Sequence, residues 1–87
     1  MTSQAIQIRN LIGYEGEGEW YKPVVGNLGQ RDAVMVEILQ VGLDRGEIQL
    51  IGRVVDDNYE PTSLPGSATG IVPVSGLNPQ TLVYTRS

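Results

Sequence analysis

The stretch AVMVEILQVGLDRGEIQLIGRVV, residues 33–55, contains two apolar runs joined by a short polar segment with glycine at both ends. In the first run, residues 33–41, alternation places Val34, Val36 and Ile38 on one side of an extended chain. The methionine, glutamate, leucine and glutamine of this run are also compatible with a helix. Its β-branched residues and the glycine that follows favour a strand.

The segment between the two runs, GLDRG at residues 42–46, is typical of a hairpin connection. Gly46 supplies the positive φ that tight turns require, because glycine has no Cβ to clash. The second run, residues 47–55, alternates in the same way as the first. The sequence therefore predicts a central β-hairpin over residues 33–55.

Shorter apolar segments flank this hairpin on both sides. Each is predicted to be a short strand: residues 5–12, 20–25, 71–74 and 80–85. Pro23 confines the second of these strands to an edge or a bend, and Pro73 interrupts the third. Residues 56–70, DDNYEPTSLPGSATG, are polar and rich in proline and glycine, which predicts a long loop. Together these segments predict an all-β fold, a small barrel or sandwich of about five to six short strands.

Composition limits both the size of the fold and its chemistry. The 87 residues are enough for a single β-rich domain, residues 1–87. Cysteine and histidine are absent, which removes disulfides, thiolate metal sites and imidazole catalysis. Ten acidic residues outnumber six scattered basic ones, which argues against nucleic-acid binding. We expect neither a membrane span nor a signal peptide, because no apolar run is long enough and the N-terminus is not basic.

The stretch GYEGEGEWYKP, residues 13–23, places Glu15, Glu17 and Glu19 at alternate positions. In an extended chain neighbouring carboxylates of this kind lie ~6.6–6.8 Å apart, a spacing that suits the acid and base of an inverting glycosidase. Carboxylate oxygens also bind calcium, which makes a calcium site the second candidate. A chain of this size offers no deep cleft for a sugar, and charge with glycine discourages strand pairing. We expect a solvated loop, with a partner-facing loop and a metal site as alternatives, and we expect no catalytic, metal or cofactor site.

Aromatic and apolar side chains outside the predicted hairpin are the candidates for contact with a partner. Trp and Tyr are enriched in the residues that dominate interface energies, although a single Trp is also typical of a core. The predicted partner interface consists of Ile6, Ile8, Trp20, Tyr21, Tyr59 and Leu64.

The chain resembles the small accessory proteins of virus particles, especially the decoration or cement proteins of tailed-phage heads. It is similar to them in being short, cysteine-free, β-rich and mildly acidic, with loops such as EPTSLPGSATGIVPVSGLNPQ and an extendable N-terminal arm, MTSQAIQIRN. The resemblance covers the whole chain in type and includes no specific motif. It implies a non-catalytic virion protein that binds a major capsid protein, often as an oligomer, and reinforces the shell.

On this hypothesis residues 1–12 form an arm that adds a strand to a neighbouring subunit, and the loop at 56–70 reaches a second neighbour. The alternative for residues 5–12 is the first strand of the domain's own sheet. The alternative function is a small β-barrel adaptor, an accessory subunit of a cellular complex in the cytoplasm. Under either hypothesis we expect protein partners, with no nucleic acid and no membrane.

Overall fold

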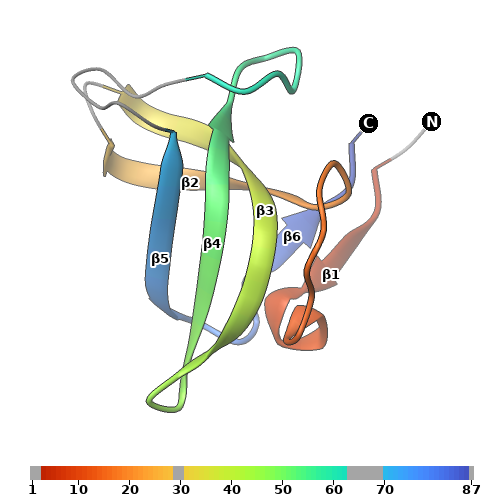
Figure 1. Ribbon diagram of the computed structural model, residues 1–87, viewed down its shortest axis with the longest axis vertical. Helices are drawn as coiled ribbons and strands as arrows, with labels where there is room; N and C mark the ends of the chain where they lie inside the picture. The colour runs from red at the N-terminus through yellow and green to blue at the C-terminus, as the bar shows by residue number, and fades with distance from the viewer. Residues whose placement is uncertain (1–2, 29–30, 63–69, 87) are drawn as a thin grey trace.

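Six antiparallel strands form one sheet in the computed structural model, which describes residues 3–28, 31–62 and 70–86 (Figure 1). The elements are β1 Ala5–Gln7, a 3₁₀ turn η1 Ile8–Leu11, β2 Tyr21–Leu28, β3 Arg31–Asp44, β4 Glu47–Val55, β5 Ile71–Leu77 and β6 Leu82–Tyr84. Their order across the sheet is β1-β6-β2-β3-β4-β5. The all-β prediction is therefore confirmed.

The central hairpin is confirmed as well, and residues 33–41 are extended rather than helical. β3 and β4 pair along almost the whole length of β4. Arg45 and Gly46 form the two-residue turn, with φ angles of 53° and 80°. Two consecutive positive φ angles match the right-handed twist of the strands that leave such a turn.

β3 is long enough to pair with two segments of the chain along the edge opposite β4. Its first part pairs with β2. Farther along, the Gly16 N–H donates to the Leu39 carbonyl at 3.0 Å, so residues 13–16 continue the edge that β2 occupies. Residues 17–19 loop out between these two pairings. The glycine-glutamate stretch is therefore a bulging segment beside β3.

The apolar core lies on one face of the sheet. It is built from buried aliphatic residues of η1 and of every strand except β1 and β2: Ile8, Leu11, Val34, Val36, Ile38, Val41, Ile48, Leu50, Val54, Val72 and Val83. The predicted strand over residues 5–12 is too long, because it ends at Gln7. A 3₁₀ turn brings residues three apart onto one side, and here it buries both Ile8 and Leu11.

β1 lies beside β6, so segments from opposite parts of the chain meet (Figure 1). The Gln4 N–H donates to Thr85 Oγ1 at 2.8 Å, and the Thr85 N–H donates to the Gln4 carbonyl at 2.9 Å. Residues 5–11 thus belong to the molecule's own sheet and core. This is the alternative to an arm over residues 1–12 that pairs with a neighbour.

Two strands contain a proline in a stretch where a ladder joins only one side of the strand among the described residues. Pro23 of β2 pairs with β3 on one side, while β6 reaches β2 only at Tyr21. Pro73 of β5 pairs with β4, and no ladder joins β5 to another strand among the described residues. The sheet is therefore open between β5 and β1. A proline lacks the N–H that an incoming strand would need.

The predicted loop over residues 56–70 is described in its first part. Residues 56–60 form a tight turn, after which the Thr62 N–H donates to the Val54 carbonyl at 2.9 Å. The chain therefore folds back on the end of β4, and residues 63–69 lie outside the described residues.

Candidate interaction surface

Two tyrosines meet on the face of the sheet opposite the core. The alternation of β2 places Tyr21 on this outer face, since Lys22 lies opposite the core residue Val36. The Tyr21 and Tyr59 ring centroids are 4.8 Å apart, with the ring planes at 70°. Such edge-to-face pairs add about 0.5–1.5 kcal/mol beyond simple burial. Tyr59 helps to cover Tyr21, which is only 2% exposed.

Tyr59 reaches Tyr21 from a turn with an unusual backbone. Its φ angle is 62°, in the left-handed region that a bulky residue rarely adopts. The turn is held by Asp56, whose Oδ1 accepts hydrogen bonds from the N–H groups of Asn58 at 2.8 Å and Glu60 at 3.0 Å. This side-chain bonding to the backbone is the chemistry that Asp brings to turns. It offsets the strain and fixes the position of the Tyr59 ring.

Arg86 covers both rings. Its guanidinium carbon lies 4.8 Å from the centroid of Tyr59 and 5.9 Å from that of Tyr21. A cation over a ring face is attracted by about 0.5–1 kcal/mol at exposed sites. Burial raises the pKa of the Tyr21 hydroxyl, and the nearby Arg86 charge acts in the opposite direction. Residues from β2, the turn after β4 and the C-terminal segment are thus held together.

Two further side chains extend this face toward solvent. Tyr84 pairs directly with Tyr21, so both side chains point to the same side of the sheet, and Leu82 follows by alternation. Leu82 is 45% exposed and Tyr84 is 37% exposed. We call Tyr21, Tyr59, Leu82, Tyr84 and Arg86 the tyrosine surface. It combines aromatic and arginine side chains with an exposed apolar one.

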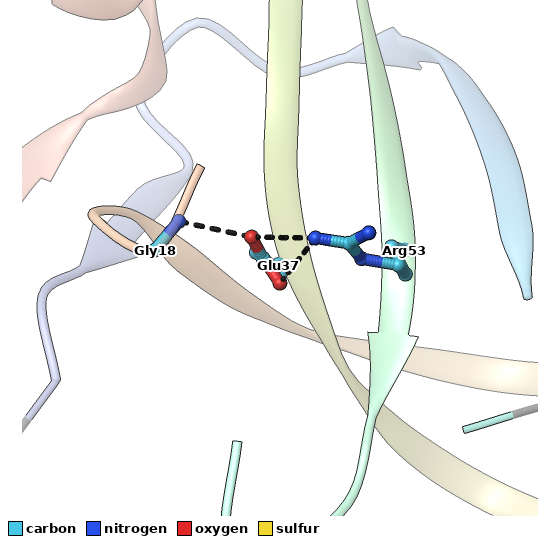
Figure 2. A network of polar contacts seen from close by, with 3 residues as sticks. All are labelled: Gly18, Glu37 and Arg53. Atoms are coloured by element: carbon cyan, nitrogen blue, oxygen red, sulfur yellow. Dashed lines mark hydrogen bonds and ion pairs between the residues drawn. The ribbon is translucent and has the colours of Figure 1, made fainter. Parts of the chain in front are cut away.

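A partly buried ion pair lies next to the tyrosine surface (Figure 2). Glu37 is opposite Tyr21 on one side and opposite Arg53 on the other. Arg53 Nη2 lies 3.3 Å from Glu37 Oε1 and 3.2 Å from Oε2, and the Gly18 N–H donates to Oε2 at 2.9 Å. Glu37 is only 4% exposed. Its charge is therefore balanced by Arg53, and it holds the bulging loop on the outer face.

Tyr14, which packs against the apolar core, has a raised pKa. The main cause is burial, and the carboxylates of Glu19 and Glu37 act in the same direction. The Tyr14 hydroxyl is buried without a hydrogen-bond partner in the part of the chain that the structure describes. A Cβ at Gly16 would lie 2.5 Å from that hydroxyl oxygen, so the Tyr14 side chain would have to shift if Gly16 were replaced.

Glu15, Glu17 and Glu19 are exposed, which agrees with a solvated loop. Gly18 between them has a φ angle of 73°, a conformation that suits glycine. Within the described ranges, no three acidic, histidine or cysteine side chains are placed to hold a metal ion.

Burial lowers the pKa of Lys22, the chain's single lysine, and its Nζ donates to the Pro23 carbonyl at 3.0 Å.

The residues predicted to contact a partner are spread over both faces. Ile6 and Trp20 are partly buried against the core, and Ile8 is fully buried within it. Tyr21 and Tyr59 meet in the tyrosine surface, while Leu64 lies outside the described residues. The side chains of Ile8 and Tyr21 serve the molecule's own packing.

The interface predicted from the sequence did not include Leu82, Tyr84 or Arg86. The alternation of residues 80–85 does place Leu82 and Tyr84 on a common side. It does not say which side faces the core. The pairing of Tyr84 with Tyr21 and the seating of Arg86 depend on contacts between distant segments.

Comparisons with protein-family models, with curated proteins and with solved structures gave no match to this chain. Among the described residues, no helix has the length and apolar character needed to cross a membrane.

Proposed function

We propose that the protein is a non-catalytic assembly protein that binds a larger protein assembly through its tyrosine surface. The observation that carries this proposal is the exposure of Leu82 and Tyr84 beside the stacked Tyr59 and Arg86. Tyrosine and arginine are enriched among interface residues that dominate binding energy. The Asp56 turn and the ring stacking also hold Tyr59 and Arg86 in place before binding, which lowers the entropy cost of association.

The structural use of the charged groups also supports a non-catalytic role. Among the described residues, Glu37 is the one acidic residue that is buried. Its carboxylate accepts hydrogen bonds from Arg53 and Gly18. A general acid or base needs a perturbed group with access to a substrate. Glu37 is instead paired and covered.

The partner that we propose is the protein shell of a virus particle, where the chain would act as a decoration or cement protein, as a single copy or an oligomer. This part rests on the resemblance in size, composition and loops. The adaptor function in a cytoplasmic complex is the second candidate, and the position of residues 5–11 favours it. These residues pair with β6 and pack in the molecule's own core, which supports a chain that uses them for its own fold and not as an arm to a neighbour.

The test is co-purification from the native source, with the mass measured by light scattering and the associated proteins identified by mass spectrometry. We expect the wild-type chain in a large particle or in a defined complex with a shell protein. The double variant Leu82→Ser/Tyr84→Ser should elute as the free 9.4 kDa chain. The matched control is Leu43→Ser, because Leu43 is 60% exposed in the β3–β4 hairpin, away from β6.

Two results would contradict the proposal. Retention of the double variant in the particle, with loss of the Leu43→Ser control, would move the interface to the hairpin end. A wild-type chain that is a free monomer in its native source would remove the assembly function itself. Co-purification with a cytoplasmic complex and no shell protein would select the adaptor function.

A further inference from the structure

We propose that the segment docking on the tyrosine surface is a basic protein segment, with lysine or arginine placed beside an apolar side chain. This inference rests on the proposed function, because it specifies the chemistry of the partner at the same surface. The apolar anchors are Leu82 and Tyr84, and the charge around them determines which occupant fits.

Exposed carboxylates flank the tyrosine surface on two sides. The turn that carries Tyr59 also carries Asp57 and Glu60. The bulging loop carries Glu17 and Glu19, and its Gly18 amide is bonded to Glu37, the direct neighbour of Tyr21. In Figure 1 this loop, the turn after β4 and the C-terminal end lie at the same end of the molecule, away from the β3–β4 hairpin turn.

The described cations near this surface do not neutralise these carboxylates. Arg53 is paired with Glu37, and Arg86 is stacked on the tyrosine rings. Among the described residues the Arg53–Glu37 contact is the one salt bridge. No ion pair therefore occupies the carboxylates of Glu17, Glu19, Asp57 and Glu60. The exposed side chains of the loop and the turn therefore place negative charge beside the surface that holds Leu82 and Tyr84, with Arg86 as a positive charge on the surface itself.

A negative field around an apolar patch favours cationic partners and repels anionic ones. Complementary charge steers association and raises its rate, and it penalises a partner of the same sign. Nucleic acids and anionic lipid surfaces are therefore unsuited to this face. Arg86 adds directionality, because the partner's cations must lie over the loop and the turn while its apolar side chain covers Leu82 and Tyr84.

The experiment uses the ¹⁵N-labelled full chain and three acetylated, amidated heptapeptides as probes. The first alternates leucine with lysine and arginine, and the others carry glutamine or glutamate at the basic positions. We expect the basic peptide to shift the amide signals of Leu82, Tyr84 and Tyr59, with binding at least ~5-fold tighter than that of the glutamine peptide at low salt. Its affinity should fall as salt is raised, and the glutamate peptide should not bind.

Two variants with the same change in net charge separate a local effect from a general one. Glu17→Gln/Asp57→Asn removes two charges beside the tyrosine surface, and Asp44→Asn/Glu47→Gln removes two at the β3–β4 turn. We expect the first pair to weaken binding of the basic peptide by ~3-fold or more and the second to leave it within ~1.5-fold.

Three results would overturn the inference. They are equal binding of the basic and glutamine peptides, equal effects of the two charge variants, and concentration-dependent dimerisation through Leu82 and Tyr84, which would make a second copy the occupant. If the chain co-purifies with an assembly through Leu82 and Tyr84 but the charge variants bind it normally, the inference fails and the proposed function stands. If the Leu82→Ser/Tyr84→Ser variant still co-purifies, the proposed function at this surface fails.

Discussion

Glu37 and Arg53 lie directly opposite each other on β3 and β4, and their ion pair includes the carboxylate that binds the tip of the bulging loop at Gly18. Each partner has a separate task. Arg53 balances the buried charge, while the Glu37 carboxylate accepts the Gly18 N–H. The loop before β2 therefore depends on an interaction between two other strands.

Removing Arg53 should destabilise the fold more than removing an unpaired arginine. In Arg53→Met the Glu37 carboxylate stays buried with only the Gly18 amide as partner, and we expect a loss of ~1–3 kcal/mol, less than for a fully buried pair because Arg53 is partly exposed. Urea unfolding measures this loss, with Arg9→Met as control. The double variant Glu37→Gln/Arg53→Met should lose less than the sum of its single changes, and strict additivity would show that the pair is not coupled.

Replacing Tyr14 by Phe should raise stability. The Tyr14 hydroxyl is buried without a partner among the described residues, so its removal relieves a desolvation cost, and we expect a gain of up to ~1 kcal/mol. Thermal or urea unfolding measures the change. Tyr84→Phe, at an exposed hydroxyl, should stay within ~0.5 kcal/mol of the wild type. A destabilised Tyr14→Phe protein would mean that the hydroxyl has a partner after all.

Gly52 and Gly42 make a matched pair for testing packing between β3 and β4. A Cβ at Gly52 would collide with Val36 Cγ1 and lie 2.9 Å from the Glu37 carbonyl oxygen, whereas nothing lies within 4 Å of a Cβ at Gly42. We expect Gly52→Ala to cost ~1–3 kcal/mol or to prevent folding, and Gly42→Ala to stay within ~0.5 kcal/mol. Circular dichroism with urea unfolding separates these outcomes. Similar effects at the two positions would contradict the close approach at Gly52.

Stability should fall in alkaline solution because of Tyr14 and Tyr21. Burial raises both pKa values above the ordinary value of 10.0, so the folded state favours the neutral hydroxyls. Their contribution is complete below about pH 10 and is lost as the pH rises through the folded-state pKa values. Lys22, whose pKa burial lowers, contributes with the opposite sign. Urea unfolding from about pH 8 to 11 should therefore show a shallower loss in Tyr14→Phe/Tyr21→Phe than in the wild type, and equal slopes would refute this assignment.

The elements with strong local signals were predictable. Residues 33–55 combine alternation with a glycine-containing turn, and the hairpin follows from these two properties. The end of β1 was not predictable in the same way. Alternation suggested a strand through residue 12, but the chain turns at Ile8 because a 3₁₀ turn buries Ile8 and Leu11 together.

The candidate surface was only partly predictable, because it depends on strand register. Tyr21 and Tyr59 were candidates from residue type, and they do meet. Nothing local indicates that Tyr21 pairs with Tyr84 or that Arg86 stacks on Tyr59. Trp20 and Tyr21 also lie on opposite faces, since neighbours in a strand alternate, so a pair of adjacent aromatics could not form a single anchor.

The pairing of β1 with β6 has a consequence for how the protein is made. The Gln4–Thr85 contact joins residues 81 positions apart, so the first strand has no partner until the last one has left the ribosome. The β3–β4 hairpin can form earlier from local contacts, while pairings between distant segments form slowly. We infer that the nascent chain holds a preformed hairpin with an unattached N-terminal segment. The native sheet is completed only once β6 has left the ribosome, by a late step that pairs β6 with β1.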